Sequence, residues 1–182
     1  LLSNQLETAM KNILTLYTFI LASPIAVFAG EPNCDVSLDV RFLEGAPVDR
    51  FVLTNGSERG IIQAEVQFDL RPSAGKLIFD TQSGGSGVEV YQPFESTAAN
   101  LDVADGAEGL RMPLGGLGAG ASISFTIDVD DRLTASDLGQ IRVSGSEMQG
   151  TVVTLTIDEH SYSAVFNAKN LAVIDAGCAD KI

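Results

Sequence analysis

The sequence is poor in basic residues, histidine and cysteine. It has 11 lysines and arginines against 24 aspartates and glutamates, a formal net charge of −13, and therefore no basic stripe on which a nucleic acid could sit. The single histidine is His160, and the two cysteines form no C-x-x-C motif, which argues against a zinc or redox site. No G-x-S-x-G motif and no P-loop lysine occur. These absences predict a protein that is not an enzyme and binds no nucleic acid.

One long apolar run occurs, over residues 13–27. Lys11 precedes it and the small residue Ala29 follows it, an order typical of a secretory signal peptide and too short for a retained membrane span. We expect residues 1–29 to be an upstream extension and a signal-peptide helix, and residues 30–182 to be a single domain. The protein is then secreted or periplasmic, with no integral membrane span in its mature chain.

Cys34 and Cys178 lie near the two ends of this expected domain. In an oxidising compartment an isolated pair of cysteines is most simply a disulfide bond. Because the loop it closes is long, the bond would stabilise the fold by about 4 to 5 kcal/mol in the chain-entropy picture.

Alternation of apolar and polar residues with period two dominates the rest of the chain. It is clearest at 36–42, 62–70, 123–129 and 153–157. Shorter β-prone runs occur at 51–54, 76–79, 88–91, 140–143, 162–166 and 171–174, with Gly- and Pro-rich turns between the runs, for example at Gly115-Gly116. About ten short strands spaced in this way predict an all-β antiparallel sandwich, immunoglobulin-like or jelly-roll-like. A helical turn is expected only over Leu133–Leu138.

The alternation also predicts which side chains face the core. Glu65, Gln67 and Asp128 should face outward. The expected inward residues are Val40, Phe42, Val66, Phe68, Phe125, Ile127, Leu155 and Ile157.

Two stretches resemble bacterial adhesion-type immunoglobulin-like modules: 51–70, with its Asn55-Gly56 turn, and 114–129, a leucine, glycine and serine segment leading into an alternating strand. Residues 87–95 and 125–131 are similar to small exported bacterial proteins labelled "aggregation factor core". That resemblance implies calcium-assisted adhesion. The chain departs from true immunoglobulin domains in having no tryptophan and no mid-strand cysteine pair.

Acidic residues gather at the end of one predicted strand, at Asp128, Asp130 and Asp131. These three carboxylates could converge at a sheet rim, with Asp102 and Asp105 completing an oxygen shell for Ca²⁺. The spacing is not that of an EF-hand, whose twelfth position, counted from Asp128, would be Gly139. The alternative is an acidic strand end that keeps a sheet edge soluble.

Together these patterns predict an exported, noncatalytic β-sandwich that binds or adheres to a protein or glycan surface, with calcium as its candidate cofactor. A secreted hydrolase that uses paired carboxylates and a structural subunit of a surface assembly are the alternatives. The sequence leaves the oligomeric state open.

Overall fold

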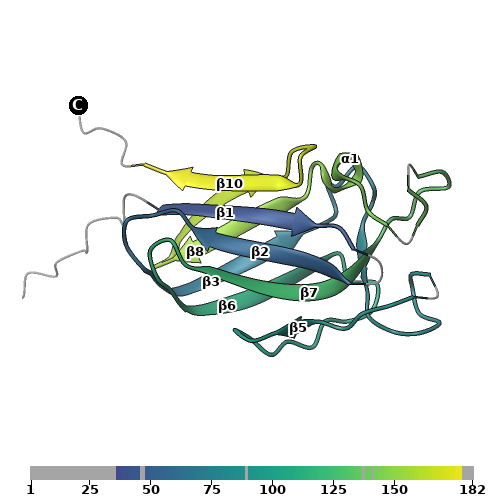
Figure 1. Ribbon diagram of the computed structural model, residues 1–182, viewed down its shortest axis with the longest axis horizontal. Helices are drawn as coiled ribbons and strands as arrows, with labels where there is room; N and C mark the ends of the chain where they lie inside the picture. Colours follow the sequence, from purple (N-terminus) through teal and green to yellow (C-terminus); the bar gives the residue numbers. More distant parts are fainter. Residues whose placement is uncertain (1–35, 46–47, 89, 137, 141, 178–182) are drawn as a thin grey trace, which may run out of the picture. The chain divides into compact units, whose positions relative to one another are not determined.

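The computed structural model describes residues 36–45, 48–88, 90–136, 138–140 and 142–177, which form two antiparallel sheets packed face to face (Figure 1). The larger sheet contains β1 (Val36–Leu43), β2 (Asp49–Asn55), β4 (Ile78–Asp80), β5 (Glu95–Ser96), β7 (Ser122–Asp130) and β10 (Leu171–Ala176). The smaller sheet contains β3 (Ile61–Asp69), β6 (Gly109–Leu117), β8 (Val152–Ile157) and β9 (His160–Val165). Short helix α1 spans Gly145–Met148. The predicted all-β sandwich is confirmed.

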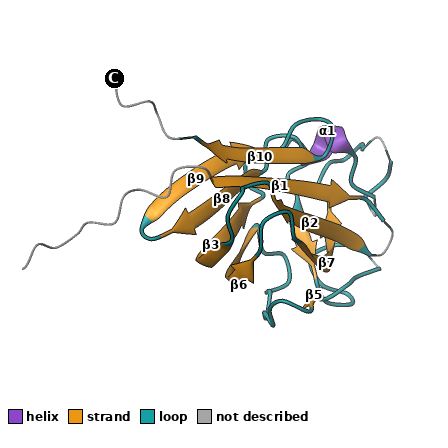
Figure 2. Ribbon diagram, turned by 60° about the vertical axis from the view of Figure 1, so that its left-hand side comes forward, coloured by secondary structure: helices purple, strands orange, loops and turns teal. Residues whose placement is uncertain are grey.

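The strands follow the order β10-β1-β2-β7-β4 in the larger sheet and β6-β3-β8-β9 in the smaller one, and the turned view of Figure 2 shows both layers. The short strand β5 also pairs with β7, beyond the stretch that β4 occupies. The edge of β7 that faces away from β2 is therefore covered by two separate pieces of chain. This edge carries the candidate site.

The core lies between the two sheets, and all eight residues expected to face it are buried, the most exposed being Ile157 at 3%. Phe51 is central: its ring stacks on Phe125 at 4.9 Å and meets the edge of Phe68, from the opposite sheet, at 5.0 Å. Aromatic pairs at such distances stabilise a core beyond the area they bury. Because a one-residue slip would turn a strand's whole apolar set outward, this packing fixes the strand registers.

Three local expectations are wrong. The described residues within 88–91 and 140–143 form no strand, and those within 133–138 form no helix. A short β-prone run forms a strand only where a neighbouring strand has a free edge to pair with. For the run at 88–91, the nearby edge of β7 is already paired with β4 and β5. The one helix of the described chain forms instead where Ser144 and Glu147 make a reciprocal capping box.

Two further details of the strands depart from expectation. Gly115 and Gly116, expected in a turn, lie inside β6. In β3 the positive φ of Gln63 (50°) interrupts the alternation, so that Ile61 is buried and Ile62 is 64% exposed. A single backbone distortion thus reverses the facing of two neighbouring isoleucines.

The first and last strands pair with each other, with Val36 opposite Ala176. Cys34 and Cys178, and the predicted signal peptide within 1–29, lie outside the described residues. The pairing of β1 with β10 brings the two ends of the described chain together, as the predicted disulfide requires.

Candidate metal centre

β4 and β7 bring three aspartates to one point. Asp80, the last residue of β4, lies directly opposite Asp128 of β7, and Asp130 lies two residues further along β7 on the same face. Each offers a carboxylate oxygen, and the three oxygens lie within 4.8 Å of one another. We call Asp80, Asp128 and Asp130 the aspartate triad. Like charges placed opposite each other on paired strands repel, so this arrangement needs a compensating charge.

The triad carboxylates are buried, and most of their oxygens have no hydrogen-bond partner among the described residues. The exposed fraction is 0% for Asp80 and Asp128 and 1% for Asp130. Within the described residues, five of the six triad oxygens have no hydrogen-bond partner; the sixth, Oδ2 of Asp130, accepts the Val88 N–H at 2.8 Å. No ion pair between described residues includes a triad member. Because buried carboxylates without partners strongly destabilise a fold, these oxygens point to a cation.

The glycine-rich chain between β4 and β5 covers the triad. We call its residues 81–88 and 90–94 the strap. Gly87 lies so close to the triad that a Cβ atom built on it would come 2.5 Å from Oδ2 of Asp80 and would also collide with Asp130. Further along the strap, Gln92 donates its N–H to the carbonyl of Asp80 at 3.3 Å and accepts the N–H of Asp128 at 3.0 Å. Glycine at position 87 is thus required by the close approach of the strap to the carboxylates.

Asp105 holds the start of the strap in place. Its two carboxylate oxygens accept the N–H groups of Thr81 at 3.0 Å and Ser86 at 2.6 Å. These bonds lower the pKa of Asp105 to about 2, the Thr81 N–H contributing most. Asp105 is therefore ionised, supports the strap through the strap's backbone, and also adjoins the triad through its side-chain interaction with Asp80.

The triad's pKa values move in the opposite direction. Burial raises the pKa of Asp128 to about 8, and the charges of Asp130, Asp49 and Asp80 add to the rise. Burial likewise raises the pKa of Asp80 to about 6, with further contributions from Asp105 and Asp130. Burial also raises the pKa of Asp130, against the opposing effect of the Val88 N–H. Each shift reflects the difficulty of holding negative charge here without a cation.

The geometry and chemistry of the triad suit Ca²⁺. Calcium binds oxygen ligands at about 2.3 to 2.6 Å, so two ligands on opposite sides of the ion lie about 5 Å apart, and the triad oxygens fall within that span. All three side chains are carboxylates, the hard ligands that Ca²⁺ prefers, whereas structural zinc sites are built mainly from cysteine and histidine. Asp80, Asp128 and Asp130 could therefore hold one calcium ion together.

Of the five metal ligands predicted from the sequence, Asp128 and Asp130 belong to the triad. Asp131 directly follows β7 and is not a member of the triad; its Oδ1 accepts the N–H of Leu133 at 2.8 Å. Asp102 is exposed and Asp105 supports the strap. Asp128 was expected to face outward: it does lie on the side of β7 opposite the core, but the strap covers it, so the expectation of an exposed side chain is wrong.

Asp80 is a candidate ligand that the sequence pattern did not reveal. It ends a three-residue strand and stands shortly before the glycine run that begins at Ser83. An acidic residue at the junction of a strand and a glycine-rich loop is the signal that could have identified it. The pairing of β4 with β7, which creates the site, joins residues about fifty positions apart and leaves no local trace.

Asp49 is a fourth buried acid close by, but it has a structural role. Its two oxygens accept the N–H groups of Gly45 at 2.9 Å and Val129 at 3.0 Å, which extends the β2–β7 ladder past the start of β2. Burial raises its pKa to about 7 in spite of these two bonds. With both oxygens occupied, Asp49 contributes charge to the site and no ligand.

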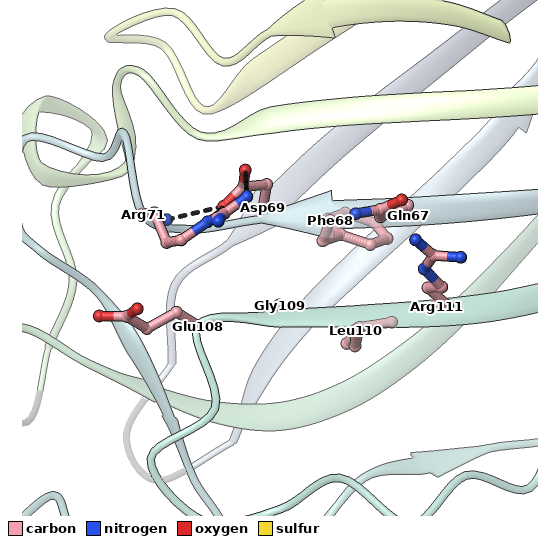
Figure 3. A pocket seen from close by; sticks show the side chains of 8 residues that line it. All are labelled: Gln67, Phe68, Asp69, Arg71, Glu108, Gly109, Leu110 and Arg111. Carbon is pink, nitrogen blue, oxygen red and sulfur yellow. Dashed lines mark hydrogen bonds and ion pairs between the residues drawn. The ribbon is translucent and has the colours of Figure 1, made fainter.

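A surface pocket of about 340 Å³ beside the ends of β3 and β6 contains two acidic residues and two arginines (Figure 3). There Asp69 receives two hydrogen bonds from the Arg71 guanidinium, at 2.6 and 2.8 Å, and Glu108 pairs with Arg132. Each of these carboxylates already has a positive partner. The pocket therefore lacks the uncompensated charge that distinguishes the triad.

Comparison of the chain with protein-family models, curated proteins and solved structures finds no match. Across the described residues, no helix has the length and apolar character needed to cross a membrane. The interpretation of the site therefore depends on its geometry.

Proposed function

We propose that this protein is an exported, noncatalytic β-sandwich module that binds or adheres to a protein or glycan surface, and that Ca²⁺ bound by the aspartate triad supports this role. The observation that carries the calcium site is the set of five buried triad oxygens without a hydrogen-bond partner among the described residues. The expected signal peptide and the resemblance to adhesion-type modules support export and adhesion.

Burial of the triad beneath the strap favours a binding module over a hydrolase. A glycosidase needs two carboxylates that flank a substrate bond, whereas all three triad side chains are at most 1% exposed. The strap also presents Val90 and Tyr91, which are 36% and 42% exposed. These two residues stand between Val88 and Gln92, the points at which the strap is bonded to triad residues. Aromatic side chains held in this way are typical anchors of a binding surface.

Isothermal titration calorimetry of the purified, chelator-treated protein tests the metal site. We expect Ca²⁺ to bind with one ion per chain and Asp80→Asn to abolish or greatly weaken the binding. Asp102→Asn removes the same charge from an exposed position outside the triad and should leave binding unchanged. Equal binding by both variants would contradict the assignment of the site.

Adhesion is tested separately with beads that carry the protein. We expect them to bind cell surfaces or one another in Ca²⁺ and to disperse in chelator, with Tyr91→Ala reducing adhesion while Ca²⁺ binding persists. Adhesion that is equal with and without Ca²⁺ would separate the adhesive role from the metal site. Absence of adhesion under both conditions would refute the adhesive role.

A further inference from the structure

The contacts of the strap divide into those that depend on the triad and those that do not. Three of its backbone bonds go to triad residues: Val88 N–H to Asp130, Gln92 N–H to Asp80, and the Asp128 N–H to Gln92. At the far end, Phe94 stacks on Phe125 at 5.1 Å, and β5 pairs with Phe125 and Thr126. Only one of these bonds, from Val88, reaches a triad carboxylate, beside which Gly87 also lies. The start of the strap is held by Asp105 and its end by the core.

Closing the strap over an empty triad is unfavourable. It removes three carboxylates from water, two of which already lie opposite each other on β4 and β7, and supplies one N–H bond, from Val88, to their six oxygens. Opening the strap would return the carboxylates to water at the loss of a few backbone bonds. A divalent cation reverses this balance, because the closed form then holds the ion on all three carboxylates.

Between the part held by Asp105 and the stacked ring of Phe94, the strap has few other attachments. The strap contains three glycines, Gly84, Gly85 and Gly87, of which Gly84 has a φ of +70°, and two of its apolar side chains, Val90 and Tyr91, are at least 36% exposed. Segments with few buried apolar contacts are drawn from the low-stability end of a fold. Ordering this glycine-rich chain therefore needs a specific attachment.

We infer that the cation bound by the triad is the latch of the middle of the strap: when it is bound, residues 87, 88 and 90–92 lie against β7, and when it is removed they detach and uncover the edge of β7 near Asp128, while Asp105 keeps the start of the strap in place. This inference rests on the proposed calcium site and adds a conformational role to it. Presentation of Val90 and Tyr91 would then depend on Ca²⁺, with β5 and Phe94 acting as the fixed end.

Hydrogen exchange measured by mass spectrometry tests the latch on the intact protein in chelator, in Ca²⁺, in Mg²⁺ and in NaCl of matched ionic strength. Openings that release the ion become rarer by a factor of 1 + [L]/Kd, so at a hundredfold excess over Kd exchange in the strap should slow about 100-fold. The Asp128 amide, which bonds to Gln92, should slow with it. Amides of β8, which lies in the other sheet, report unfolding of the whole domain, and their lack of exchange during the measurement shows that the strap opens locally.

Asp80→Asn and Asp128→Asn should remove the Ca²⁺-dependent difference, and Asp102→Asn should retain it. If calorimetry shows Ca²⁺ binding while exchange in the strap is unchanged, the latch is refuted and the calcium site stands. If Ca²⁺ does not bind, both are refuted. The comparison of chelator with Ca²⁺ needs no variant, so a substitution that fails to fold does not weaken the test.

Discussion

Replacement of Asp128 by asparagine should change the stability of the protein in opposite directions with and without calcium. Both Asp128 oxygens are buried without a hydrogen-bond partner among the described residues, and burial raises the pKa of Asp128 from 3.8 to about 8. An unfolded aspartate is ionised at pH 7, whereas the folded one must either keep its proton or bury its charge. The side chain therefore destabilises the metal-free fold at this pH.

The magnitude follows from the pKa shift. About three pKa units lie between 3.8 and pH 7, and each is worth about 1.4 kcal/mol, so the destabilisation at pH 7 is about 4 kcal/mol. Asparagine removes the charge but buries an amide, which costs about 1 to 3 kcal/mol depending on its hydrogen bonds to Asp80 and Asp130. The metal-free Asp128→Asn variant should therefore be more stable than the wild type by about 1 to 3 kcal/mol.

In saturating Ca²⁺ the order should reverse. The wild type gains about 4 kcal/mol at a thousandfold excess over Kd, and the variant, which has lost a ligand, gains little. Thermal or urea unfolding of both proteins in chelator and in Ca²⁺, at pH 7, measures the four stabilities. Asp102→Asn is the matched control and should behave like the wild type in both solutions. A variant that is less stable than the wild type in chelator, or that gains as much from Ca²⁺, would refute the reasoning.

Three further predictions follow from the same structure. Because the pKa values of the triad are raised in the folded state, the folded protein holds its protons more tightly than the unfolded chain does, and this favours folding most fully below pH 4. The free energy of unfolding of the metal-free protein, measured by urea titration, should therefore fall from about pH 4 to about pH 8. Saturating Ca²⁺ should reduce this fall. A slope of the opposite sign would contradict the burial of the triad. Gly87→Ala should weaken Ca²⁺ binding by about tenfold or more in calorimetry, because the new Cβ atom would collide with the triad carboxylates. A loss of about 1.4 kcal/mol of binding free energy is enough for a tenfold effect. Gly116→Ala, whose Cβ atom would have nothing within 4 Å, should leave binding unchanged. Unchanged binding by Gly87→Ala would mean that the strap moves freely. Cys34 and Cys178 should be disulfide-bonded, because the pairing of Val36 with Ala176 brings together the two ends of the described chain that lead to them. Two free thiols in an Ellman assay of the unreduced protein would refute this.

The sequence was sufficient for the sandwich because alternation is a local signal. In β7, Phe125 and Ile127 fall on one face whatever the strand pairs with, and burial of that face requires a second sheet. The same argument identified the inward residues of β1, β3 and β8. It failed at Ile62, where one positive φ at Gln63 reverses the facing of the neighbouring side chains.

Two of the three triad residues were accessible in the same way. Asp128 and Asp130 share a face of one strand, so their proximity follows from the two-residue period. The sequence also placed both acids opposite the core, and on the usual reading that face is solvated. Nothing local indicated that a glycine-rich segment from elsewhere in the chain would cover it.

Only the tertiary structure brought Asp80 opposite Asp128 and laid the strap over both. Strand pairing between distant segments depends on which edges remain free after the sheets assemble, and that is a property of the whole chain. Charge burial has the same origin: an aspartate that would be ordinary on an open strand becomes a candidate cation ligand when a distant loop removes it from water. The sequence by itself therefore determined the layers and their facing residues, and the tertiary structure decided which carboxylates meet and what covers them.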